Sequence, residues 1–121
     1  MNISVILAHP DETSFNHAIA HAAVAQLERN GHVVAFHNFQ KEAFDPLLMA
    51  AEIPRDAVLP ETIKMHCNDI TEADGIIIVH PNWWGQPPAL MKGRITLRPR
   101  LPEALVLAIW HRQFLKQITT N

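Results

Sequence analysis

Several residue types and motifs are scarce in this sequence of 121 residues, and each scarcity narrows the range of functions. Its one cysteine, Cys67, cannot form an internal disulfide, so a reducing cytoplasmic location is expected. Its formal net charge of -2 gives no electrostatic reason to expect nucleic acid or an anionic membrane as a partner. All apolar runs fall well short of the roughly 20 residues that a membrane-spanning helix needs. The N-terminus also lacks the features of a signal peptide, so we expect a soluble intracellular protein.

The common nucleotide-binding signatures are missing as well. The chain contains neither a G-x-G-x-x-G motif nor a P-loop lysine motif, and it has no tyrosine. What is present is a balance of 48% hydrophobic and 18% charged residues, which is typical of a folded globular protein. At this length we expect one domain over residues 1–121 with a hydrophobic core of its own.

The hydrophobic pattern alternates between strand-like and helix-like segments. Strands are predicted at residues 3–8, 32–39 and 75–80, the first and third being apolar on both faces. Helices are predicted from Phe15 to just before Gly31 and over 61–72, and residues 87–93 are predicted to form the start of a third helix. The apolar positions of the first two helices are Phe15, Ile19, Ala22, Ala23 and Leu27, then Ile63, Cys67 and Ile70. This alternation predicts an α/β fold with an open, doubly wound parallel sheet.

The pattern changes after Gly93. Residues 94–103 are basic and contain two prolines, and residues 104–118 place Leu107, Trp110, Phe114 and Ile118 on one helical stripe. A strand over 104–110 is the alternative. A complete doubly wound domain usually has five strands, whereas three are clear here. We therefore expect a sheet truncated after the third strand and the start of the third helix.

Two loops, "HPDETSFN" and "HPNWWGQP", follow the first and third predicted strands. In open α/β sheets, ligands bind beyond the carboxyl ends of the strands, where the strand order reverses. In the order 2-1-3-4-5, strands one and three flank that point. Because His9 and His80 each precede a proline at these two strand ends, we expect both loops to line one crevice.

The first loop has the parts of an anion site. The backbone N–H groups of Ser14, Phe15 and Asn16 begin a helix, whose dipole favours negative charge. The hydroxyls of Thr13 and Ser14, the amide of Asn16 and the ring of His9 can add hydrogen bonds to a phosphate. The alternative is that Thr13 or Ser14 only caps the helix.

The second loop offers flat aromatic surface. Trp83 and Trp84 can stack on a planar cofactor ring, Gly85 allows close backbone approach, and the N–H groups of 83–85 can bond ring heteroatoms. The alternative is that both tryptophans pack on neighbouring helices or on a dimer partner.

Other candidate residues receive structural interpretations. His17 and His21 are four apart on the first helix but lack an obvious third ligand, so we expect a solvated helix face and no metal site. Cys67 is expected to be a buried structural thiol. Asp11 and Glu12 are expected to be solvated loop residues.

The segments "AHPDETSFN", "FDPLL" and "EADGIIIVHPNWWGQPPALMKG", in this order over residues 1–93, resemble the NAD(P)H:quinone oxidoreductase (DT-diaphorase-like) family of flavodoxin-like flavoproteins. The resemblance implies FAD or FMN as cofactor, NAD(P)H as co-substrate, a quinone-type acceptor and a homodimer. It implies that the flavin phosphates lie at His9, Thr13, Ser14, Phe15 and Asn16, and the flavin ring at Pro81, Asn82, Trp83, Trp84 and Gly85. No catalytic residue is assigned.

The resemblance ends at Gly93. Members of the family continue with a Trp-Ile-Asp-Arg-Val-like helix and a third flavin loop rich in glycine with a tyrosine, which residues 94–121 do not contain. Our hypothesis is that residues 94–121 come from a shifted reading frame or an equivalent disruption; a short natural variant, whose tail helix covers the sheet edge, is the rival explanation. Two further functions therefore stay open: a non-catalytic ancillary subunit of a potassium efflux system, and an inactive truncated fragment.

Overall fold

The chain folds as a parallel sheet with helices on both faces. The computed structural model describes residues 1–43, 45–54, 56–96 and 108–109. The elements, in chain order, are β1 (Asn2–Leu7), α1 (Phe15–Arg29), β2 (Val33–Asn38), the 3-10 helix η1 (Ala50–Glu52), α2 (Glu61–Thr71), β3 (Gly75–Val79), α3 (Ala89–Thr96) and β4 (Ala108–Ile109). The three predicted strands and three predicted helices are therefore confirmed, with ends that differ by one or two residues.

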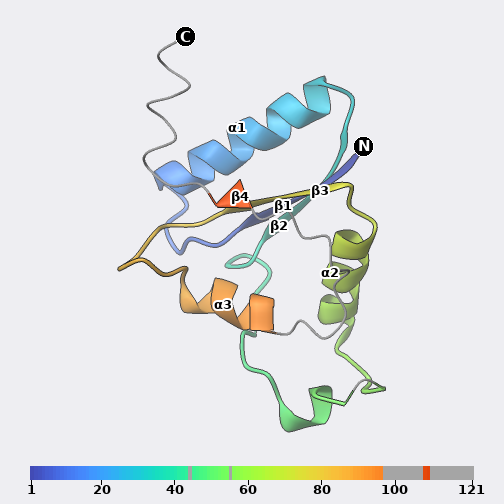
Figure 1. The fold of residues 1–121 in the computed structure, drawn as a ribbon. Coiled ribbons are helices and arrows are strands. Elements are labelled where there is room, and N and C mark those ends of the chain that lie inside the picture. The colour runs from blue at the N-terminus through green and yellow to red at the C-terminus, as the bar shows by residue number, and fades with distance from the viewer. Residues whose placement is uncertain (44, 55, 97–107, 110–121) are drawn as a thin grey trace.

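The sheet has the strand order β2-β1-β3-β4, and all of its neighbouring strands are parallel. In the registers Val5 pairs with Phe36 on one side and with Ile77 on the other, so β1 lies in the interior of the sheet. Figure 1 shows α1 against one face of the sheet, and α2 and α3 against the other. The order β2-β1-β3 is the one that we expected for a flavodoxin-like, doubly wound sheet, and the two-residue strand β4 lies beyond the third strand, where we expected the sheet to end.

Alternation along the strands divides the core between the two faces. Leu7 and Val79 pack with Ala20 of α1 in one cluster. Their neighbours Ile6 and Ile78 point the other way, into a cluster with residues of α2 and α3. Because both faces are covered by helices, β1 and β3 are apolar at consecutive positions, which is why they appeared as continuous apolar runs in the sequence.

The helices depart from the expected burial at a few positions. On α1 the buried residues are His17 and Ala20, while Phe15 is 66% exposed rather than part of the apolar stripe. On α2 the buried residues are Ile63, His66 and Ile70. Cys67 is half-buried against the larger core cluster rather than fully buried. Among the described residues, no helix combines the length and hydropathy needed to cross a membrane.

The segment after Gly93 is described only in part. Ala108 and Ile109 form β4, paired with Ile77 and Ile78 of β3. The helical prediction is therefore wrong at these two positions, and the strand alternative is confirmed for them. The positions that we assigned to a helical stripe, Leu107, Trp110, Phe114 and Ile118, lie outside the described residues, as does Phe44 of "FDPLL".

Gly93 lies at a packing contact between two motifs that are far apart in the sequence. A Cβ atom at Gly93 of α3 would overlap the Cβ, Cα and carbonyl oxygen of Pro46, in the connection between β2 and α2. Pro46 belongs to "FDPLL" and Gly93 closes "ALMKG". The glycine therefore allows α3 to pack directly on the backbone of this connection.

Candidate functional site

The loops that follow β1 and β3 leave the sheet at the same edge and contact each other. At the strand ends the Ala8 N–H donates to the Val79 carbonyl at 3.1 Å. Beyond the strands, the rings of His9 and Trp83 meet edge to face, with centroids 5.8 Å apart. In Figure 1 both connections, β1 to α1 and β3 to α3, turn outward at this edge. The two loops that the sequence singled out are thus brought together.

Asp11 organises the first loop. One carboxylate oxygen accepts hydrogen bonds from the Thr13 N–H at 2.8 Å and from the Thr13 hydroxyl at 2.7 Å. The Asp11 carbonyl accepts from the Ser14 N–H, and the Asp11 N–H donates to Nδ1 of His9. The Thr13 hydroxyl and N–H hold the pKa of Asp11 below its ordinary value of 3.8. Sequence reasoning missed this role, although Asp two residues before Thr in a loop is a common turn signal.

The N-terminus of α1 faces this loop. Ser14 is the N-cap with extended backbone angles, and its hydroxyl accepts from the His17 N–H at 3.4 Å. The first turn of α1 contains no acidic side chain, so its N–H groups and dipole are not neutralised from within the helix. Around it Thr13 and Phe15 are exposed, and Ser14 and Asn16 are half-buried. The capping role and an anion-binding role are thus compatible at one serine.

His17 of α1 contacts His9 of the first loop. It is buried, its Nε2 lies 3.3 Å from the His9 carbonyl oxygen, and its ring packs at right angles to the His9 ring. The expected solvated face is therefore wrong for His17 and right for His21, which is exposed. The only potential metal-binding group found among the described residues does not include either histidine.

The second loop is a tight hairpin turn. Trp83 and Gln86 exchange two backbone hydrogen bonds, at 3.1 and 2.9 Å. Between them Trp84 and Gly85 both have positive φ angles, 49° and 78°. Two central residues of positive φ define a type I′ turn, in which Gly85 fits without strain. Trp84 stands at its tip and is 97% exposed, whereas Trp83 is 42% exposed and lies against His9.

Trp84 is held in an unfavourable backbone conformation. A left-handed conformation costs a residue with a Cβ roughly 1–2 kcal/mol, and it is rare for a bulky side chain. The two hairpin hydrogen bonds keep Trp84 there although its ring contacts water. Such strain at an exposed position is typical of functional sites rather than of core packing. The alternative that Trp84 packs on neighbouring helices is wrong within the described chain.

Pro81 and Asn82, which the resemblance places at the flavin ring, directly precede the hairpin turn. The Pro81 carbonyl lies 2.8 Å from Nδ1 of His80, Pro81 is half-buried, and Asn82 is exposed. The Trp83 N–H donates to Gln86, so it does not serve as the free donor that we expected over residues 83–85. The site therefore joins a helix N-terminus suited to an anion with an aromatic surface suited to a planar group.

Comparisons with known proteins agree with this architecture. The sequence model of the family described as having a flavodoxin-like fold matches residues 1–95. An uncharacterised NAD(P)H oxidoreductase of Haemophilus influenzae is 35% identical over 96 residues, covering 77% of this chain and 48% of that protein. NAD(P)H dehydrogenase [quinone] 1 of Cavia porcellus is 31% identical over 108 residues, covering 74% of this chain and 39% of the relative.

A solved structure supports the same assignment. The NAD(P)H:quinone oxidoreductase of Methanothermobacter marburgensis superposes with a TM-score of 0.67 at 27% identity, covering 75% of this chain and 49% of that one. The chain thus spans about half the length of the relatives that it matches. With the family match over residues 1–95 and the strand order β2-β1-β3-β4, the chain belongs to the family with the flavodoxin-like fold.

Proposed function

We propose that the chain is part of a flavin-dependent NAD(P)H oxidoreductase with a quinone-type acceptor. The observation that carries this proposal is the contact between His9 and Trp83, with ring centroids 5.8 Å apart. It joins the N-terminal end of α1 to the tryptophan hairpin at one edge of the sheet. A flavin nucleotide has the same two parts, an anionic phosphate end and a planar ring, at the two ends of one molecule.

The first loop fits the phosphate end. In an α-helix the first-turn N–H groups have no intrahelical partner, so those of Phe15 and Asn16 suit an anion. His9, Thr13, Ser14 and the Asn16 amide add polar groups around them. The two donors of Thr13 are held by the Asp11 carboxylate. A phosphate that used Thr13 would therefore take the place of this carboxylate oxygen.

The second loop fits the ring end. Trp84 presents a nearly fully exposed indole, whereas Trp83 and Pro81 are less exposed. Pro81, Asn82, Trp83, Trp84 and Gly85 would thus flank the ring, covering apolar surface and excluding water. When bound, a flavin supplies the exchange of hydride equivalents between NAD(P)H and an acceptor. The chain's own contribution is to fix the position of the cofactor and to shield it.

The co-substrate and the acceptor are inferred from the relatives. Two of them are named as NAD(P)H dehydrogenase [quinone] and NAD(P)H:quinone oxidoreductase, which supports NAD(P)H and a quinone-type acceptor. Either FAD or FMN satisfies the phosphate and ring contacts proposed above. A homodimer and a cytoplasmic location stay predictions from the resemblance and from the single cysteine.

Reconstitution tests the proposal directly. The full chain is incubated with FMN or FAD, dialysed, and assayed by flavin absorbance and by NADH or NADPH oxidation in the presence of a quinone. We expect retained flavin in a one-to-one ratio and quinone-dependent oxidation of one nucleotide. Retained flavin without turnover keeps the binding assignment and refutes the activity of this chain. A folded chain that retains neither flavin refutes both.

A further inference from the structure

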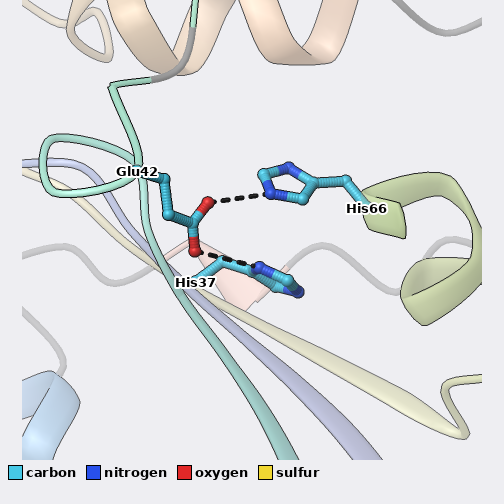
Figure 2. A group of neighbouring side chains, drawn as sticks. All are labelled: His37, Glu42 and His66. Atoms are coloured by element: carbon cyan, nitrogen blue, oxygen red, sulfur yellow. Dashed lines mark hydrogen bonds and ion pairs between the residues drawn. The ribbon is translucent and has the colours of Figure 1, made fainter. Parts of the chain in front are cut away.

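Two histidines and a glutamate converge on the face of the sheet that carries α2. His37 comes from β2, Glu42 from the loop that follows it, and His66 from α2 (Figure 2). Nδ1 of His37 lies 3.2 Å from one oxygen of Glu42, and Nε2 of His66 lies 2.8 Å from the other. The three residues each offer a ligand atom within 4.8 Å of the others. No part of the proposed flavin site uses them.

The charges of this cluster are compatible with a bound cation. Nε2 of His37 lies 3.1 Å from a carboxylate oxygen of Asp69 on α2, so both ring nitrogens of His37 face carboxylates. A neutral imidazole carries one N–H and can donate to one carboxylate only. The other nitrogen then directs its lone pair at a negative oxygen. A positive charge at that nitrogen removes the conflict, and it can be the second proton of an imidazolium or a metal ion.

The geometry matches a coordination shell. Zinc binds histidine nitrogen and carboxylate oxygen at about 2.0–2.2 Å, so ligand atoms in a tetrahedral site lie roughly 3.3 Å apart. The separations of 3.2 and 2.8 Å, each to a different oxygen of Glu42, are hydrogen-bond distances, so small side-chain shifts would give that spacing. Two histidines and one glutamate are also a common zinc ligand set, and they leave a fourth position for water. We propose that His37, Glu42 and His66 bind a divalent zinc-class ion.

Asp69 completes the arrangement as a positioning residue. In metal sites the ligating histidine usually donates its other ring N–H to a carboxylate, which fixes the tautomer and the ring orientation. Asp69 stands at this position on His37. With Nε2 bearing the hydrogen, Nδ1 of His37 presents its lone pair to the metal.

Burial gives the ion an ordered site and a route of entry. The side chains of His37 and His66 are 7% and 1% exposed, whereas that of Glu42 is 25% exposed. The ion would therefore enter past Glu42 and become tied to β2, its following loop and α2. The ion would clamp the β2–α2 connection to the helix that covers it.

Zinc binding by the full chain tests this proposal. The purified protein is stripped with a chelator and dialysed against Zn²⁺ alone, without flavin, and the bound metal is measured by mass spectrometry. We expect one Zn²⁺ per chain and a rise of the unfolding midpoint with zinc concentration. Co²⁺ in place of Zn²⁺ is expected to give the visible absorption of a four-coordinate site. A wild-type chain that binds no stoichiometric zinc overturns the proposal.

Variants separate this site from surface histidines. Glu42→Gln and His66→Gln should weaken zinc binding by more than about tenfold, and Asp69→Asn by roughly tenfold. Glu42→Gln is nearly isosteric and partly exposed, so circular dichroism should show a native fold for it even if His66→Gln is unstable. The matched control is His21→Gln. It removes an exposed histidine whose ring lies near that of His17 on α1. If His21→Gln abolishes stoichiometric binding while Glu42→Gln retains it, the ion lies on α1 and the proposal is wrong.

Discussion

The two loops of the candidate site are built in opposite ways. The loop after β1 is tied together by Asp11, whose side chain and main chain bond Thr13, Ser14 and His9. The loop after β3 has a two-residue hairpin turn closed by the Trp83–Gln86 pair, with the strained Trp84 at its tip. The first loop keeps its polar groups bonded within the chain, whereas the second exposes an apolar ring to water.

This difference indicates which contributions each loop makes to stability and to binding. In the first loop the same groups cap the helix and offer donors to an anion, so stability and binding are coupled. In the second loop the exposed ring of Trp84 adds no packing, and its backbone conformation is unfavourable. Changes there should therefore affect binding without lowering stability. Variants at Trp84, Ser14 and Asp11 test this contrast, and a variant of Gly93, in the helix that follows the second loop, is expected to have the largest effect on stability.

Gly93→Ala should have the largest effect. A methyl group at this position overlaps the backbone of Pro46, so α3, which follows the tryptophan hairpin, must shift. We expect a loss of about 1–3 kcal/mol in the free energy of unfolding, measured by urea denaturation. Alanine is the better helix former by about 1 kcal/mol. A stabilised variant would therefore show that α3 does not pack on Pro46.

Trp84→Ala should weaken flavin binding about tenfold, which corresponds to roughly 1.4 kcal/mol, because an aromatic face is lost. Its unfolding midpoint should not fall, since the ring is exposed. Isothermal titration and thermal unfolding measure the two quantities. Trp84→Phe should recover most of the affinity, and Val58→Ala, at another exposed apolar position, should leave it unchanged. Equal affinity in Trp84→Ala would remove the ring-side role.

Ser14→Ala should lower stability by about 1 kcal/mol through loss of the N-cap, and it should also weaken flavin binding. The paired variant is Ser14→Asp, which retains a capping oxygen but adds negative charge at the helix N-terminus. It should keep the wild-type stability and lose affinity for the phosphate. If Ser14→Asp binds FMN as well as the wild type does, the serine is a cap alone.

Asp11→Asn should have the smallest effect, because Asp11 is exposed and its hydrogen bonds to Thr13 compete with water. The pKa of Asp11 is lowered in the folded chain, mainly by the Thr13 hydroxyl, so its contribution to stability is complete above the ordinary value of 3.8. It is lost as the pH falls below 3.8 toward the lowered pKa. The variant should lack this part of the acid dependence in unfolding midpoints measured from about pH 5 to pH 2. An acid profile identical to that of the wild type would contradict the role of Asp11.

Much of the fold could be predicted because its signals are local. The runs that became β1 and β3 are apolar at successive positions, as strands covered on both faces must be. Ser14 and Gly31 mark the ends of α1 through capping chemistry, which depends on neighbouring backbone groups only. The pairing of loops after β1 and β3 follows from the strand order of doubly wound sheets.

The features that were missed depend on tertiary contacts. His66 lies on the same helical stripe as Ile63 and Ile70, but a histidine there gives no sign of its partners. His37 and Glu42 meet it only because the turn after β2, closed by the Glu42 N–H to the Asn38 carbonyl, places Glu42 between His37 and His66 of α2. The backbone contact between Gly93 and Pro46 is likewise invisible in either local sequence. Periodicity reveals which face is buried, and it does not reveal what that face touches.

The exposure of Trp84 also gives the molecule an optical reporter of its own. An indole ring in water emits at longer wavelength than one in an apolar setting, and a flavin that absorbs in the emission range quenches it. Because Trp84 stands alone at the tip of its hairpin, its signal responds to whatever covers that ring rather than to unfolding of the core. Subtracting the emission of Trp84→Phe isolates this signal, so ligand arrival at the hairpin can be followed in real time without a label.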